Sequence, residues 1–384
     1  RQGRNVALSN TGSPTPWHLD ELTDSLYFVA EAYDTLFTGT NAYRLVKHNR
    51  LSVTMEEVSG AGPAPGPVDG EFREQLTLEQ ENTYALWSVL HDRNADYWFW
   101  NLVVSGPNGD GTLTVPLDLP GATGSGEAEM RIHLLGATEL VSGDDHRVRA
   151  RVNGVDVGTT MKWDGWGTPA ELIVTFNQAL LQAGGGDTLT LVSEHTPGAV
   201  HIQWLDRIDV DYWRAKEVEN GQLWLKNLDR GIQTVSGFDS ADIRVVQEPA
   251  GNAVWREDVS VSHDGIGGFQ VTFNVDTAGD FLVVQESAVG FPAAEIDVPS
   301  KLAKRNNRAD YLIIAPRVLE QTAAALAAYR EQTVGRVSIA WLDDIFDEFG
   351  WGREDPQAIS EFLKTVKSTW RRVPSDVVFL GRGT

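Results

Sequence analysis

The sequence contains no cysteine. Without a thiol, the chain as given can form no disulfide, no cysteine-ligated zinc site and no cysteine nucleophile. It also lacks any apolar run near the length of a membrane-spanning helix, which needs about 20 residues. Basic residues are scarce, because 32 Lys and Arg stand against 54 Asp and Glu, a net charge of −22. This balance disfavours binding to nucleic acids and anionic membranes, since both attract basic surfaces.

The acidity is confined to one part of the chain. Residues 301–384 contain 13 Lys and Arg and 11 Asp and Glu, so residues 1–300 have a net charge of −24. A chain of 384 residues is long enough for two or three domains. The uneven charge indicates two different kinds of structure along the chain.

Up to about residue 292, short alternating runs recur between turns rich in Gly, Asn, Asp and Pro. This spacing is typical of antiparallel β-sandwiches. The dipeptide Asn153-Gly154 joins two such runs and is the strongest short-range signal for a hairpin. The predicted strands cover residues 111–119, 129–135, 147–152, 172–176, 187–192, 207–213, 242–246, 258–261, 268–275 and 280–284.

After residue 308 the pattern changes. Residues 311–315 form a continuous apolar run, as expected for a strand buried on both faces of a parallel sheet. Asp355 and Pro356 suit the N-cap and first position of a helix. The predicted strands are 311–315, 336–341 and 376–380, and the predicted helices are 318–331, 343–349 and 355–370. This βαβαβ order is half of a doubly wound sheet, so we expect further strands or a companion chain to complete it.

The predicted fold class is therefore multidomain β plus α/β. We expect a β-rich N-terminal region at 1–100, a jelly-roll-like β-sandwich at 101–215, a small β-sandwich at 216–295, a linker at 296–308 and a truncated α/β domain at 309–384. The basic run at 301–308 is interpreted as a solvated linker, with exposure to proteolytic processing as the alternative.

Several segments resemble the opening of the gingipain-type cysteine peptidase domain. They are residues 309–314, 326–330, 344–350, 355–363 and 377–381. The β region resembles what precedes that domain in large secreted members, at residues 41–45, 96–100, 152–155, 205–212 and 235–238. The resemblance implies a caspase-like peptidase subdomain, with its catalytic His and Cys further along than residue 384. The last strand ends in Gly381-Arg382, where the family usually has Gly-Asp.

The α/β part holds no candidate catalytic or cofactor-binding residue. None of the eight His lies in residues 301–384, so no catalytic residue is assigned. Calcium is the favoured metal, in a structural role, because carboxylates and carbonyls in Gly-rich turns suit a hard cation. The weak calcium candidates are Asn108, Asp110, Asp144 and Asp145. For each of them alone, an Asx-turn at a hairpin end is the favoured interpretation.

Two further patterns have a functional and a structural interpretation. The tryptophans at 98, 100, 163, 166, 204 and 213 offer stacking faces for sugars, but core packing is favoured for them. Asp344 and Glu348 are spaced to share a helix face, as a paired-carboxylate site requires. A solvated helix start is favoured there, because acidic residues suit the helix dipole.

The sequence thus predicts the N-terminal fragment of a secreted gingipain-like cysteine endopeptidase, inactive alone, with accessory or pro-domain β regions. The expected partners are the rest of the peptidase domain or a companion chain, and protein substrates for the intact enzyme. The alternative is a non-catalytic extracellular surface or matrix protein. Its acidic β domains would serve calcium-dependent adhesion, glycan binding or assembly.

Overall fold

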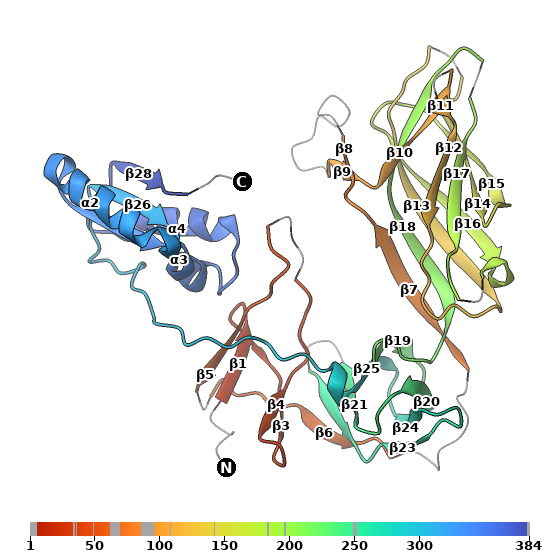
Figure 1. The fold of residues 1–384 in the computed structure, drawn as a ribbon, viewed down its shortest axis with the longest axis horizontal. Coiled ribbons are helices and arrows are strands. Elements are labelled where there is room, and N and C mark those ends of the chain that lie inside the picture. The colour runs from red at the N-terminus through yellow and green to blue at the C-terminus, as the bar shows by residue number, and fades with distance from the viewer. Residues whose placement is uncertain are drawn as a thin grey trace. The chain divides into compact units, whose positions relative to one another are not determined.

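The chain divides into two compact units. Figure 1 shows its strands and helices in chain order from red to blue. Unit 1 comprises Arg1–Glu57, Ala250–Trp255 and Gly290–Thr384, and unit 2 comprises Val58–Pro249 and Arg256–Val289. The computed structural model describes residues 6–33, 35, 37–48, 50–61, 70–85, 96–107, 109–141, 143–182, 184–195, 197–248 and 252–381. Among these residues, no helix is both long and apolar enough to span a membrane. The predicted class, β plus α/β, is confirmed.

Unit 2 contains a sandwich of two antiparallel sheets. One sheet has the order β11-β10-β18-β13-β16, with β7 paired to β18, and the other has the order β12-β17-β14-β15. Their strands are β7 (Glu71–Glu79), β10 (Asn101–Gly106), β11 (Gly109–Asp110), β12 (Thr112–Pro116), β13 (Glu127–Gly136), β14 (His146–Val152), β15 (Val155–Trp163), β16 (Pro169–Asn177), β17 (Thr188–Ser193) and β18 (His201–Ala215). The core includes the fully buried Met130, Leu191, Leu205 and Tyr212.

The local signals of this sandwich are confirmed. Asn153 and Gly154 have φ values of 49° and 81°, the left-handed conformation that a two-residue hairpin turn between β14 and β15 requires. In β14, every second residue is buried, as the alternating sequence predicts. The sheet also includes β7, which pairs along β18 from Arg207 opposite Glu79 to Ala215 opposite Glu71. This sheet therefore begins before the border expected at residue 101.

A second, smaller sandwich follows in unit 2. Strands β19 (Gln222–Leu228) and β21 (Ile243–Glu248) flank β25 (Gly279–Gln285) in one sheet. Strands β20 (Gly231–Phe238) and β23 (Ser260–His263) flank β24 (Phe269–Val275) in the other. Val245, Phe273 and Phe281 are fully buried between them. The chain also forms strands β6 (Glu56–Ser59) and β22 (Val254–Glu257).

The N-terminal part of unit 1 is a small β structure. Its sheet has the order β2-β1-β5, made of β2 (Ser13–Thr15), β1 (Val6–Asn10) and β5 (Tyr43–Lys47). A separate hairpin joins β3 (His18–Asp20) to β4 (Ser25–Tyr27).

The C-terminal part of unit 1 is a three-stranded parallel sheet covered by helices. Strand β26 (Tyr311–Ala315) lies between β27 (Val337–Trp341) and β28 (Asp376–Phe379). The helices are α2 (Glu320–Val334), α3 (Leu342–Phe349) and α4 (Pro356–Thr369), and a 3₁₀ turn at Arg317–Leu319 precedes α2. Two further 3₁₀ turns of the described residues, Gln178–Leu180 and Glu286–Ala288, lie in unit 2. All five residues of β26 are buried, as the continuous apolar run predicts.

The two faces of β26 pack against different helices. Leu312 and Ile314 lie in one apolar cluster with residues of α3 and α4, including Phe362. Tyr311, Ile313 and Ala315 lie in another cluster with residues of α2. The predicted start of α4 is also confirmed, because the Asp355 side chain accepts a hydrogen bond from the Gln357 amide at 2.7 Å.

Candidate functional site

The carboxyl ends of the parallel strands are the place where α/β sheets of this kind bind ligands. Here Arg317 follows β26, and Asp343 and Asp344 follow Trp341, the last residue of β27. Arg317 Nη2 donates to Asp344 Oδ1 at 2.8 Å, and the same guanidinium pairs with Asp343. The guanidinium carbon also lies 5.6 Å from the centroid of the Trp341 ring. The edge therefore carries a charge cluster whose members bind one another.

This cluster cannot by itself perform peptidase chemistry. The hydrogen bond that Arg317 donates to Asp343 raises the pKa of Arg317, so its guanidinium stays charged. Burial raises the pKa of Asp344, and Arg317 opposes that shift. A cysteine peptidase needs a thiolate beside an imidazole, and residues 301–384 contain neither side chain.

The spacing of Asp344 and Glu348 permits a carboxylate pair, but the two side chains have different partners. Asp344 binds Arg317, as described above. Glu348 accepts hydrogen bonds from the amides of Leu302 at 2.9 Å and Ala303 at 2.8 Å, and from the Ser300 hydroxyl. Glu348 therefore holds the segment that precedes the sheet. No local sequence signal predicts this contact, because it joins segments that lie more than 40 residues apart along the chain.

Asp144 and Asp145, two of the calcium candidates, are engaged by protein groups. Asp145 is 3% exposed, and its two carboxylate oxygens accept hydrogen bonds from the amides of Leu140 and Gly165, each at 2.7 Å. Asp144 forms ion pairs with Arg147 at 3.1 Å and Lys162 at 3.5 Å. These contacts give both residues a structural role, and calcium binding by them stays a prediction.

Of the other two candidates, Asp110 ends strand β11. Asp110 Oδ1 accepts a hydrogen bond from the Thr112 amide at 3.0 Å, the geometry of an Asx-turn. Asn108 lies outside the described residues. Calcium binding by these two residues also stays a prediction.

Sequence reasoning missed a different acidic group in unit 2. Oxygen atoms of Glu79, Asp96 and Asp206 all lie within 4.8 Å of one another, the one such group of three among the described residues. Glu79 ends β7, Asp206 lies in β18, and Asp96 precedes β9 (Trp98–Phe99). The strand pairing of β7 with β18 brings Glu79 close to Asp206, so no sequence spacing could reveal the group.

The electrostatics of this acidic group are unfavourable without a cation. Burial and the neighbouring Asp206 raise the pKa of Glu79. Burial, followed by the neighbouring Asp96, raises the pKa of Asp206, while Arg207 opposes the shift. Carboxylate oxygens are the ligands that Ca²⁺ prefers. A divalent cation among the three carboxylates would thus offset their mutual repulsion.

Exposed aromatic side chains stand next to this acidic group. Strand β8 (Thr83–Tyr84) pairs with β9, and the Tyr84 and Trp98 rings meet edge-on at 5.4 Å. Tyr84 is 52% exposed and Trp98 is 39% exposed. The Trp98 amide donates to Asp96 Oδ1 at 2.9 Å, which links the aromatic pair to the acidic group. Among the other tryptophans, Trp166 is exposed and Trp100 is buried in the core.

Comparison with known proteins bears on the C-terminal part of unit 1. Residues 304–384 match the model of Peptidase family C25. The gingipain-type resemblance of this segment is thereby confirmed. The C25 match begins at residue 304, inside the segment that the sequence predicts as a linker.

A solved structure extends the similarity to the rest of the chain. The crystal structure of dimeric latent PorU from Porphyromonas gingivalis matches with a TM-score of 0.54 and 16% sequence identity. The match covers 95% of this chain and 37% of the PorU chain, so this chain spans little more than a third of PorU. At this identity the similarity establishes the fold.

Other matches are weaker. The sugar-binding EclA C-terminal domain matches with a TM-score of 0.24 and 16% identity, over 30% of this chain and 80% of that domain. The ANX2 ectodomain from Arabidopsis thaliana matches with a TM-score of 0.22 and 16% identity, over 36% of this chain and 40% of that one. These scores are too low to indicate a shared fold. Among curated protein sequences, no relative matches the chain.

Proposed function

We propose that this chain is the N-terminal portion of a secreted gingipain-like cysteine endopeptidase. The C25 match at residues 304–384, on a parallel βαβαβ arrangement, is the observation that supports it. In this proposal the C25 segment opens the peptidase domain, and the β structures act as accessory or pro-domains. The intact protein would cleave peptide bonds in protein substrates, and the chain as given would be inactive because it holds no cysteine.

The free side of β28 supports a continuing sheet. Within the described residues β28 pairs with β26 alone, so its second edge has no strand partner. Val377 is 38% exposed and Phe379 is 59% exposed, although strands of parallel sheets are usually buried on both faces. A further strand and its helix would cover these apolar side chains. The remainder of the peptidase domain is the partner that we propose for this edge.

Contacts inside unit 1 support an accessory role for the N-terminal β structure. The Tyr33 hydroxyl donates to Asp355 Oδ2 at 3.4 Å, and the Arg353 guanidinium carbon lies 4.3 Å from the centroid of the Tyr33 ring. Arg44 donates to the Asp347 carbonyl at 3.3 Å. All of these partners lie in or beside α3 and α4. The N-terminal segment thus contacts the C25 segment through polar and aromatic side chains.

The proposal is tested on the protein extended along its own coding sequence. We expect the extension to encode further parallel strands, a His and a Cys. The purified long form should then be labelled by a thiol-reactive peptide probe and should cleave protein substrates. Changing the new Cys to alanine should abolish both signals, because the thiolate is the nucleophile.

Residues 1–384 are the matched control in this experiment and should give neither labelling nor cleavage. An extension without His and Cys, or a long form whose cleavage survives the Cys change, would contradict the peptidase proposal. Mass spectrometry of labelled peptides identifies the modified residue.

A second candidate function is calcium-dependent adhesion or glycan binding by unit 2. It is favoured by the acidic group of Glu79, Asp96 and Asp206 beside the exposed rings of Tyr84 and Trp98. A bound cation can coordinate sugar hydroxyls, and carboxylates can accept hydrogen bonds from them. Aromatic faces can stack on sugar rings. This function is compatible with the first, because it uses a different unit of the chain.

Calcium should raise the melting temperature of unit 2, and Glu79→Gln should remove that response. A ligand specific for the native state stabilises it by about 2.7 kcal/mol at a hundredfold excess over Kd. The raised pKa of Glu79 favours folding at acidic pH, and this contribution is lost as pH rises through the folded-state pKa. Glu79→Gln should therefore also raise the calcium-free melting temperature at neutral pH.

Asp110→Asn is the control, because Asp110 is a calcium candidate from sequence that lies outside the acidic group. Calorimetric melting with calcium and with a chelator checks both variants. If Asp110→Asn loses the calcium response and Glu79→Gln keeps it, the cation binds at Asp110 instead. A glycan array with and without calcium then tests sugar binding.

A further inference from the structure

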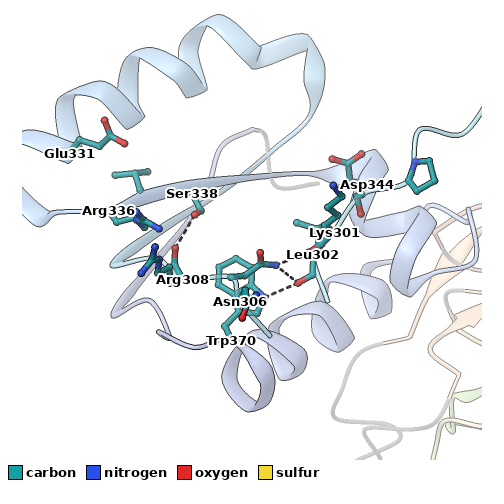
Figure 2. A pocket seen from close by; sticks show the side chains of 13 residues that line it. Lys301, Leu302, Asn306, Arg308, Glu331, Arg336, Ser338, Asp344 and Trp370 are labelled. Atoms are coloured by element: carbon teal, nitrogen blue, oxygen red, sulfur yellow. Dashed lines mark hydrogen bonds between the residues drawn. The ribbon is translucent and has the colours of Figure 1, made fainter. Parts of the chain in front are cut away.

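A cavity of about 590 Å³ lies beside β27 in the C-terminal part of unit 1 (Figure 2). Its walls come from the segment before β26, from β27, from α3 and from the ends of α2 and α4. It reaches from Arg336, which precedes β27, to Asp344, which follows that strand. Cavities of roughly 300–1,000 Å³ are the size that small-molecule sites have in proteins.

Hydrogen bonds fix the wall formed by residues 299–308. Glu348 binds the amides of Leu302 and Ala303, and the Trp370 indole donates to the Leu302 carbonyl at 2.7 Å. The Asn307 amide group donates to the Lys301 carbonyl at 2.7 Å, and the Ser338 hydroxyl donates to the Arg308 carbonyl at 3.4 Å. The segment predicted to be a solvated linker is mostly exposed, and these hydrogen bonds attach it to the sheet and helices. The cavity walls are part of the fold.

Three cationic side chains line the cavity: Lys301, Arg308 and Arg336. Within the described stretch 252–381, the structure gives none of their charged groups a hydrogen bond or an ion pair. Two nearby arginines are engaged instead, since Arg317 pairs with Asp344 and Arg372 pairs with Asp310. Three unpaired cations around one cavity give that cavity a positive electrostatic potential.

The acidic side chains of the cavity offset only part of this positive charge. Asp344 is already bound to Arg317. Glu331 lies at the end of α2, and it forms no ion pair among the described residues. Figure 2 shows Arg308 and Arg336 toward one end of the cavity and Lys301 beside Asp344 toward the other.

We propose that this cavity binds a small organic polyanion. A guanidinium presents a planar fork that matches the oxygens of a carboxylate or a phosphate, so the Arg308 and Arg336 end would hold one such group. The ammonium of Lys301 would meet a second anionic group, and Asn306 adds a neutral polar contact. The cavity is too large for one oxyanion alone. The site is independent of the proposed peptidase function. Of the charge cluster at the carboxyl ends of β26 and β27, only Asp344 lines the cavity, and it is already bound to Arg317.

The test uses isothermal titration calorimetry on residues 1–384, with citrate as a polycarboxylate probe, pyrophosphate as a polyphosphate probe and inorganic phosphate as a single-group probe. We expect citrate or pyrophosphate to bind at one site, more tightly than phosphate. The probe that binds better identifies the ligand chemistry as carboxylate or phosphate. The variants Arg308→Gln and Arg336→Gln should each weaken binding about tenfold or more, since a hydrogen bond to a charged group contributes about 1.5–3 kcal/mol.

Lys304→Gln is the matched control, because Lys304 lies in the same segment but does not line the cavity. It should leave binding unchanged, while Lys301→Gln weakens it. Circular dichroism checks that each variant keeps the helices. The proposal is overturned if no probe binds, if sodium chloride of equal ionic strength abolishes the difference between probes, or if Lys304→Gln weakens binding as much as Arg336→Gln does.

Discussion

Replacing Phe362 by alanine is expected to lower the free energy of unfolding of the C25 segment by about 3–5 kcal/mol. Phe362 lies in α4, is fully buried, and packs its ring 5.4 Å from the Phe349 ring and 6.1 Å from the Trp370 ring. The change removes apolar contacts and leaves a cavity between α4 and the sheet. Because whole domains are stable by only about 5–15 kcal/mol, the loss should remove a large share of the helical signal at physiological temperature.

Urea unfolding followed by far-ultraviolet circular dichroism measures this effect. The signal is suitable because the α-helices of the described residues, α2 to α4, all lie in this part of the chain. Phe379→Ala is the matched control, since Phe379 is 59% exposed and its loss should cost less than about 1 kcal/mol. Equal destabilisation by the two changes would show that α4 does not pack on the sheet as described.

The change Asp145→Ala is expected to destabilise the larger sandwich by about 3 kcal/mol or more. The carboxylate is buried and accepts hydrogen bonds from two backbone amides, and each hydrogen bond to a charged group contributes about 1.5–3 kcal/mol. Its removal leaves both amides without these acceptors in a buried place. The Asp145 carbonyl also accepts a hydrogen bond from His201 Nδ1 at 2.5 Å, so a shift of the backbone would disturb a second buried group.

Asp110→Ala is the control for this prediction, because it removes one hydrogen bond at an exposed turn. Thermal unfolding of both variants should be measured with calcium and with a chelator. If Asp145 acts only in the structural role, Asp145→Ala is equally destabilised under both conditions. If a chelator destabilises the wild type to the level of Asp145→Ala and leaves the variant unchanged, Asp145 is a calcium ligand.

Local structure followed closely from the sequence. The Asn153-Gly154 hairpin, the N-cap at Asp355 and the buried strand at residues 311–315 were all predicted from a few neighbouring residues. Each depends on short-range physics: left-handed backbone angles, an acceptor for a free amide, and burial of a continuous apolar run. The family resemblance of the C-terminal segment could be read from its order of motifs, and the C25 match confirms it.

The candidate sites could not be predicted in the same way. The acidic group of Glu79, Asp96 and Asp206 arises because β7 pairs with β18, two strands far apart in the sequence. The cavity with Lys301, Arg308 and Arg336 arises because Glu348 and Trp370 hold the preceding segment against the sheet. In the sequence that segment is only a run of basic residues.

Composition and near-neighbour patterns were enough to predict the fold class, about half of the strands, the three helices of the C-terminal part, and the lack of a thiol and of a histidine in residues 301–384. These properties depend on composition and on contacts between near neighbours. The long-range packing of the chain was needed to show that Asp344 and Glu348 have separate partners, that three distant carboxylates meet, and that three cations surround one cavity. Such charge arrangements depend on long-range packing, where the sign and spacing of charges along the chain carry no information about distance in space.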